Sequence, residues 1–339
     1  SDEGAKWIDF ENDEFTIDNY SYKLAKKLSK DEECPVGVII NQVNGYLYEW
    51  LNLENIEQVS PIKNYLVENN LYTDAPTKKG DTGYLEMTRS KYVSDLSIAY
   101  IIWNHGFNEI NSFNDKIYTN VYFQMLMCLM DYLNNLYRQS KIAILEIGSY
   151  DKLNVVTLRS IQKYVSNYYT EAYLIPTFDL NHVVDDEIME VDLDKLVSRI
   201  VDSLKQNINF SKYANLVYVT GSDEVVTKIK IEFSNTDMIK ILKDDVNKNK
   251  TVINYLDIYY NDLDLGIVKL EDVYYIEDNF LVIDLVYETI EDESGNVILN
   301  KVYDKEKIII SYGEYGDLTK YNLVNDSNLP IIPFKIILK

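Results

Sequence analysis

The sequence predicts an α/β domain with a parallel sheet over residues 1–207, followed by an antiparallel β-sandwich over residues 208–339. Up to about residue 207, continuous apolar runs alternate with segments of helical spacing, which is the order typical of a parallel sheet with crossover helices. Beyond that point, short segments alternate apolar and polar residues between turn signals, as antiparallel strands do. The length of 339 residues also exceeds the usual size of one domain, roughly 100 to 200 residues.

Four apolar runs in the first domain predict strands that are buried on both faces. Helical spacing between them predicts crossover helices, and a stretch with Pro61, Pro76, Gly80 and Gly83 is predicted to be rich in loops. The predicted strands are 35–40, 98–103, 141–147 and 172–178, and the predicted helices are 15–28, 118–138, 157–169 and 191–204.

The second domain is predicted from alternation and turn residues rather than from long apolar runs. Glu293-Ser-Gly-Asn296 is one such turn signal, and the charged residues 243–250 are expected to form a solvated loop. The predicted strands are 216–220, 228–233, 255–259, 280–284 and 307–311.

Charge and composition exclude several classes of function. The 55 acidic and 33 basic residues give a formal charge of -22, which repels phosphate backbones, so we expect no nucleic-acid partner. No apolar run approaches the roughly 20 residues of a spanning helix, so no membrane insertion is expected. Cys34 and Cys128 form neither a metal-spaced cluster nor a disulfide framework, and we expect both to be buried apolar residues.

The run Asn322-Leu-Val-Asn-Asp-Ser-Asn-Leu-Pro-Ile-Ile-Pro-Phe-Lys335 has a spacing of Asn, Leu-Pro and Pro-Phe that is hard to obtain by chance. It resembles the closing signature of the sialate O-acetylesterase-like branch of SGNH esterases. That resemblance implies a flavodoxin-like, doubly wound parallel sheet for the first domain and an activity on acetylated carbohydrate.

Three internal blocks are similar to the same family. Pro35-Val-Gly-Val-Ile39, with Gly45 and Glu49-Trp50, resembles a strand that enters a Gly-Gly-Thr turn and a Glu-x-Trp motif, with one glycine missing. Ile101-Ile-Trp-Asn-His-Gly106 resembles a Trp-Tyr-Gln-Gly-Glu block, with His105 in place of Gln and Phe107 in place of Glu. Asp186-Glu-Ile-Met-Glu190 resembles an Asp-x-Ile-His-Pro block.

The resemblance implies a Ser–His–Asp mechanism, and most of that catalytic set is absent. Met189 takes the position of the histidine, and a thioether cannot act as a general base near neutral pH. Asp186 alone remains of the acid–base pair. His182 is a candidate substitute base, although an ordinary hydrogen-bonded loop residue explains it as well, and the same holds for His105. Neither Ser149 nor Ser222 follows the first strand, where the family carries its serine.

No cofactor and no metal site is predicted. The two histidines are far apart, and Asp185-Asp186-Glu187 and Asp262-Leu-Asp264 are ordinary solvated charge runs that would hold a cation such as calcium only weakly. The 30 tyrosines suit stacking on a sugar or a protein interface, and they equally suit the two cores.

The resemblance also implies that the first, central strand of the sheet is missing. Its absence would leave rows of backbone groups unpaired inside the fold, so another segment must fill the place. We expect an upstream precursor fragment or a partner subunit to supply it. Residues 1–14 are an alternative source, because Trp7-Ile-Asp-Phe10 alternates apolar and polar groups.

The leading hypothesis is a catalytically degenerate, structural or carbohydrate-facing module of a larger assembly. The abundance of Tyr, Asn, Ile and Lys fits an AT-rich coding sequence, such as that of a phage, so a virion protein of the tail or host-attachment apparatus is one setting. A virion or extracellular location is favoured. The alternative is an active carbohydrate O-acetylesterase whose serine lies on a separate upstream segment and whose base is His182 or acts through water.

Overall fold

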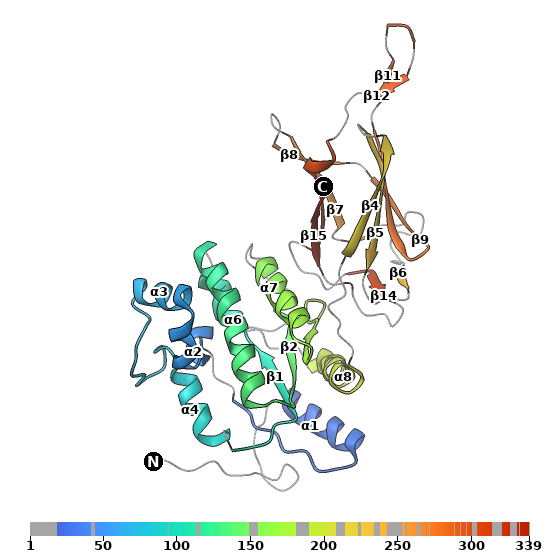
Figure 1. Ribbon diagram of the computed structural model, residues 1–339. Coiled ribbons are helices and arrows are strands. Elements are labelled where there is room, and N and C mark those ends of the chain that lie inside the picture. Colours follow the sequence, from blue (N-terminus) through green and yellow to red (C-terminus); the bar gives the residue numbers. More distant parts are fainter. Residues whose placement is uncertain are drawn as a thin grey trace. The chain divides into compact units, whose positions relative to one another are not determined.

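The structure is a computed structural model in which the chain forms two compact units, 1–211 and 212–339 (Figure 1). In the first unit it describes residues 19–41, 45–93, 95–112, 116–148, 155–180 and 190–207. In the second it describes 214–222, 225–233, 238–242, 253–254, 256–262, 266–270, 272–287, 289–291, 293–295, 297–299, 304–313, 321–325, 331 and 333–338.

The first unit contains a parallel sheet of three strands in the order β1-β2-β3. These strands are β1 (Tyr100–Asn104), β2 (Lys141–Leu145) and β3 (Ala172–Ile175). In the register, Ile102 lies beside Ala143, and Ala143 lies beside Tyr173. The mixed α/β architecture with a parallel sheet agrees with the prediction, and the observed strands begin or end within three residues of the predicted ones.

Helices cover this sheet in two layers (Figure 1). The crossover helices α6 (Lys116–Leu136) and α7 (Val155–Tyr168) pack on each other. On the opposite face, α8 (Glu190–Gln206) packs on β2 and β3 and also against α1 (Asn19–Glu32). The apolar side of α1, with Leu24, Ala25 and Leu28, is buried.

The stretch predicted to be rich in loops is confirmed over residues 69–83, which hold Pro76, Gly80 and Gly83 and form no helix or strand, but the chain on both sides of these residues is helical. It contains η1 (Leu47–Trp50), α2 (Leu53–Gln58), α3 (Ser60–Glu68) and α4 (Tyr84–Val93), and α5 (Phe107–Ser112) follows β1. Pro61 on its own indicates a loop, but it lies in the first turn of α3. A proline costs nothing there, because the first helical N–H groups have no partner within the helix.

The predicted buried strand at residues 35–40 is also wrong. The segment Pro35–Asn41 is non-helical and lies outside any strand, and Ile39 and Ile40 are 44% and 41% exposed. The apolar sequence indicates a strand, but a strand forms only where a neighbour accepts its backbone hydrogen bonds. Cys34, beside this segment, is exposed rather than buried, whereas Cys128 is buried as expected and burial raises its pKa to about 11.

The second unit consists of antiparallel sheets around a shared core. One four-stranded sheet has the order β4-β5-β10-β9 and the other has the order β15-β13-β7-β8. Ile229, Ile231, Ile258, Ile283 and Ile310 from these sheets meet in one apolar cluster. The strands are β4 (Ala214–Ser222), β5 (Val225–Phe233), β7 (Leu256–Asp262), β8 (Gly266–Lys269), β9 (Asp272–Glu277), β10 (Phe280–Leu285), β13 (Ile308–Tyr312) and β15 (Phe334–Ile337), with the smaller pairs β6 (Ile239–Ile241) and β14 (Leu323–Asn325), and β11 (Thr289–Glu291) and β12 (Val297–Leu299).

The C-terminal run that carries the family resemblance helps to close this second unit. Asn322 is buried, and its side-chain oxygen accepts a hydrogen bond from the Asn254 backbone N–H at 2.8 Å. The ring of Phe334 packs against those of Phe233 and Tyr312 at 5.6 and 5.5 Å between centroids. The described part of this run is therefore structural, and residues 326–330 lie outside the described residues.

Candidate functional site

Buried ionisable side chains follow each of the strands β1, β2 and β3. In an open parallel sheet, ligands bind outside the carboxyl ends of the strands. Three groups of residues lie at this edge: His105 and Glu109 after β1, Glu146 after β2, and Asp179 after β3. These residues are the candidates for a functional site in the first unit.

His105 has contacts at both ring nitrogens. Its Nε2 lies 2.9 Å from the backbone oxygen of Gly45, and its Nδ1 lies 3.6 Å from Oε2 of Glu109. The ring stacks on Trp103 at 5.1 Å between centroids, and Trp103 meets Trp50 edge to face at 5.6 Å. A neutral ring that donates from Nε2 to a carbonyl has no lone pair on that nitrogen to take a proton from a nucleophile.

Glu109 ties the loop after β1 to the chain near Gly45. Its Oε1 accepts the Leu47 N–H at 2.7 Å, and its carboxyl group is fully buried. Burial raises the pKa of Glu109, against the opposing effects of His105 and of the Leu47 N–H. Burial likewise raises the pKa of Tyr122, and the nearby Glu109 adds to this shift.

Gly45 lies where a side chain would not fit. An added Cβ would come within 2.5 Å of Cδ1 of Leu85 and 3.1 Å of Oε1 of Glu49. Glu49 is itself buried, and its two oxygens accept the N–H groups of Tyr46 at 2.8 Å and Gly80 at 2.7 Å. The Gly45–Trp50 block therefore organises loops, and these contacts use both carboxylate oxygens of Glu49.

Gln162 of α7 joins the ends of β1 and β2. Its Nε2 donates to the His105 carbonyl at 3.1 Å, and its Oε1 accepts the Ile147 N–H at 3.0 Å. Arg159, one turn earlier, donates to the carbonyls of Ile147 at 2.9 Å and Gly148 at 2.6 Å. These bonds satisfy buried loop backbone that a bare strand end would leave without partners.

Glu146 is buried between basic side chains. Among the described residues, neither of its carboxyl oxygens has a hydrogen-bond partner, and burial raises its pKa to about 7, against the attraction of Arg159 and Lys163. Burial also lowers the pKa of Lys163 to about 8, although the charge of Glu146 opposes this shift. A carboxyl group in this setting can hold a proton near neutral pH.

Asp179, after β3, forms a buried ion pair with α8. Arg199 binds it through two hydrogen bonds of 2.7 Å, and Lys195 adds a third at 2.6 Å. Burial alone raises the pKa of Asp179, but the hydrogen bonds and charges of Arg199 and Lys195 outweigh it and hold the pKa below its usual value. Such a carboxylate is held as a structural anion, because its lone pairs are engaged by cations.

The structure brings together only part of the predicted site. His105 and Gly45 meet directly, and Phe107 begins the helix that carries Glu109. His182, Asp186, Met189 and Ser149 lie outside the described residues, as do Asp185, Glu187 and Asp264. Within the described part of the chain, the contacts recorded for the His105 ring are with Gly45, Glu109 and Trp103, and none of these is a nucleophile.

Sequence reasoning missed Glu109, Glu146 and the Asp179–Arg199 pair. A signal was present for the last two, because Glu146 and Asp179 each come shortly after an apolar strand run. Glu109 gave no such signal, because its burial depends on Leu47, which is 62 residues away in the sequence.

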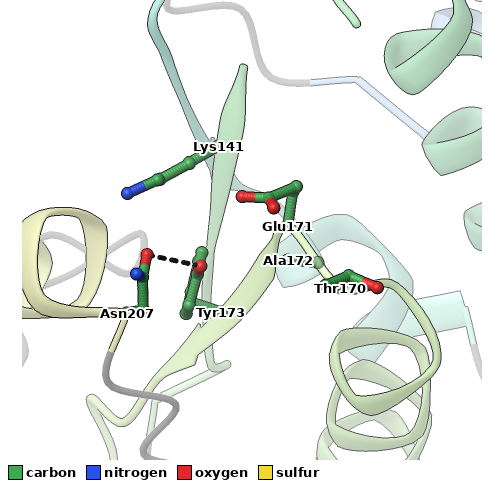
Figure 2. A pocket seen from close by; sticks show the side chains of 6 residues that line it. All are labelled: Lys141, Thr170, Glu171, Ala172, Tyr173 and Asn207. Atoms are coloured by element: carbon green, nitrogen blue, oxygen red, sulfur yellow. Dashed lines mark hydrogen bonds between the residues drawn. The ribbon is translucent and has the colours of Figure 1, made fainter. Parts of the chain in front are cut away.

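A hollow of about 390 Å³ lies at the amino ends of the strands (Figure 2). It is lined by Lys141, Thr170, Glu171, Ala172, Tyr173 and Asn207, and the Tyr173 hydroxyl donates to Asn207 at 3.0 Å. This is where β2 and β3 begin, opposite the edge at which parallel sheets bind ligands. Among the described residues, no group of three His, Cys, Asp or Glu side chains is placed to hold a metal ion, and no helix is long and apolar enough to cross a membrane.

Comparison with solved structures finds a carbohydrate acetylesterase from Xanthomonas citri. The TM-score is 0.61 at 10% sequence identity, over 94% of this chain. The likeness is one of fold. This chain spans 64% of the length of that protein, so the esterase has substantial sequence without a counterpart here. No family model and no curated protein sequence matches this chain.

Proposed function

We propose that this chain is a carbohydrate-esterase-like module that faces carbohydrate or has a structural role in a larger assembly, and that it does not itself hydrolyse esters. The observation that carries the proposal is the state of His105, whose Nε2 lies 2.9 Å from the Gly45 carbonyl oxygen and whose ring has no hydroxyl nucleophile among its recorded contacts. A serine hydrolase needs a histidine nitrogen that is free to take the proton of the serine.

The finer parts of the proposal rest on sequence. The run from Asn322 to Lys335 supports the sialate O-acetylesterase-like branch of SGNH esterases, and Met189 in place of the histidine supports loss of catalysis. The bias towards Tyr, Asn, Ile and Lys supports a setting in a phage virion, around the tail or the host-attachment apparatus. Mass spectrometry of intact particles tests that setting, because a virion protein co-purifies with the capsid at a fixed copy number.

The test of catalysis is release of acetate from an aryl acetate and from acetylated sialic acid. We expect no turnover above buffer for the chain alone and an unchanged rate for the His182→Ala variant. A matched His105→Gln variant should lose stability without any change in acetate release, because its ring supports loops.

The second candidate is an active O-acetylesterase whose serine lies on a separate polypeptide segment. The parallel sheet and the likeness to an acetylesterase fold favour it. Acetate release that appears only when a co-purifying segment is present, and that His182→Ala abolishes, would establish this alternative and end the non-catalytic proposal.

A further inference from the structure

One edge of the parallel sheet is open at β1. The Lys141 N–H donates to the Ala99 carbonyl at 3.0 Å, so by the alternation of parallel pairing Ile101 and Trp103 also face β2. The N–H and C=O groups of Tyr100, Ile102 and Asn104 therefore point away from β2. Within the described structure, none of these backbone groups has a hydrogen-bond partner.

The chain on either side of the segment Pro35–Asn41 meets the two ends of β1, in the same order as β1 runs. At its start, Cys34 lies close enough to Tyr100 to affect the pKa of that hydroxyl, which burial chiefly raises. Beyond its end, the Gly45 carbonyl meets the ring of His105, just after β1. The backbone groups of this segment also have no recorded hydrogen-bond partner among the residues that the structure describes.

Both β1 and Pro35–Asn41, which we call the walls of a gap, carry partly exposed apolar side chains. Ile39 and Ile40 are 44% and 41% exposed, and the first four side chains of β1 are half-buried, whereas those of β3 are all buried. Next to the sheet, α1 packs on α8, and α6 packs on η1, α2 and α3. A strand in the gap would extend a sheet that helices cover on both faces, and strands buried in this way are continuous apolar runs.

Residues 1–18 offer no such run. They contain seven acidic side chains, and their longest apolar run is Trp7-Ile8. We propose that the edge of β1 accepts a β-strand from polypeptide outside residues 1–339, which lies parallel to β1 and between it and Pro35–Asn41. The net charge of -22 favours a partner whose apolar strand of about five residues has basic flanks. The mode is β-strand addition, in which main-chain hydrogen bonds supply the affinity.

The probe is a synthetic peptide with five Val and Ile residues between two lysines at each end. On binding to the full chain, it should slow amide hydrogen exchange at Ile102, Asn104 and Val38 by about tenfold or more. A spin label at its N-terminus should broaden signals near Tyr100 rather than near Asn104, because the strand is parallel. A peptide of the same composition with a central proline is the control and should give no protection.

Two variants remove one donor from each wall. Ile102→Pro deletes an N–H that faces the gap and leaves the β2 ladder intact, whereas Ile102→Val retains it. Val38→Pro deletes an N–H on the other wall, in a segment whose backbone has no recorded hydrogen bonds among the described residues, so this variant keeps the inference testable if Ile102→Pro fails to fold. We expect both proline variants to lower peptide affinity at least tenfold and Ile102→Val to leave it unchanged.

Two results would overturn the inference. The first is a folded protein that shows no protection at saturating peptide concentrations. The second is protection of Ile102 in the chain alone that disappears when residues 1–18 are deleted, because the chain then fills its own edge. Neither result depends on acetate release, so failure here is distinct from failure of the proposed function.

Discussion

The two sides of the parallel sheet differ in how completely they are buried. All four residues of β3 are buried, as are the last four of β2, whereas no residue of β1 is. The β3 side is also fixed by the buried Asp179–Arg199 pair, while beside β1 the segment Pro35–Asn41 has no recorded hydrogen bond. Both β1 and β3 are edge strands of the described sheet, but the β3 side is fully buried and the β1 side is only partly buried.

This difference shows what an apolar run needs in order to become a strand. The runs at 35–40 and 172–175 are both apolar, but the second has β2 to bond with and α7 and α8 to cover it. Hydrophobic contact alone can hold a segment against the fold. The segment becomes a strand only when a neighbouring backbone pairs with its N–H and C=O groups.

The largest effect is expected on the fully buried β3 side of the sheet, at Arg199. Arg199→Met would leave the buried Asp179 with Lys195 alone, whose side chain is 40% exposed, so unfolding should become easier by ~3–5 kcal/mol. Urea unfolding followed by tryptophan fluorescence measures this loss. Lys195→Met is the control and should cost ~0–1 kcal/mol.

A second variant separates the ion pair from packing. Asp179→Leu combined with Arg199→Met removes both charges, so it should recover part of the stability that Arg199→Met loses. Equal stabilities for the double and the single variant would contradict an uncompensated buried charge as the cause.

Matched truncations compare the two sides directly. Ile144→Ala in β2 opens a cavity at a fully buried position, and should cost ~2–5 kcal/mol. Ile102→Ala in β1 removes a half-buried side chain beside the open edge and should cost about 1 kcal/mol. Similar losses for the two variants would mean that β1 is covered in solution, and would argue that its edge is already filled.

The buried carboxyl at the end of β2 should make stability depend on pH. The pKa of Glu146 is about 7 in the folded chain against an ordinary 4.5, so between these values the folded state binds more protons than the unfolded state. Stability should therefore fall as pH rises from about 4.5 to 7, by about 2–3 kcal/mol, and then level off. Urea unfolding at pH 5 and 7.5 measures this change.

Glu146→Gln isolates that contribution, because glutamine is close in shape and does not ionise. The variant should lose about 2–3 kcal/mol of the difference between pH 5 and 7.5, while contributions from Glu109 remain. A pH dependence as steep as that of the unmodified chain would contradict a buried, protonated Glu146.

Most of the sheet could be predicted from the sequence, because long apolar runs and helical spacing are local signals. The strands at β1, β2 and β3 and the helices α6, α7 and α8 are examples. The helices α2 to α4 were not predicted, and at α3 the reason is Pro61, which indicates a loop when taken alone but lies in the first turn of the helix.

The candidate site was less predictable for a related reason. His105 stood out as a titratable residue after a strand, but its contact with Gly45 joins loops 60 residues apart, and no local pattern encodes that contact. The openness of β1 likewise depends on which segment lies beside it. Periodicity shows that a strand is apolar and does not show whether both of its edges are paired.

The last comparison is made at Gly106, which follows β1 and lies close to Ile147, which follows β2. Its φ of +131° favours glycine, and an added Cβ would lie 2.3 Å from Cδ1 of the buried Ile147. Gly106→Ala should therefore cost ~1–3 kcal/mol in urea unfolding. Gly80→Ala is the matched control, because Gly80 also has a positive φ, +97°, but an added Cβ there meets nothing within 4 Å.

The difference between these two glycine variants isolates the clash from the backbone strain that both share. Ile147→Ala removes the atoms that the new Cβ would strike, so in the double variant with Gly106→Ala the two losses should sum to more than the measured total. If the losses simply add, Ile147 does not confine Gly106, and β1 and β2 are coupled at their ends mainly through the hydrogen bonds of Gln162 to His105 and Ile147.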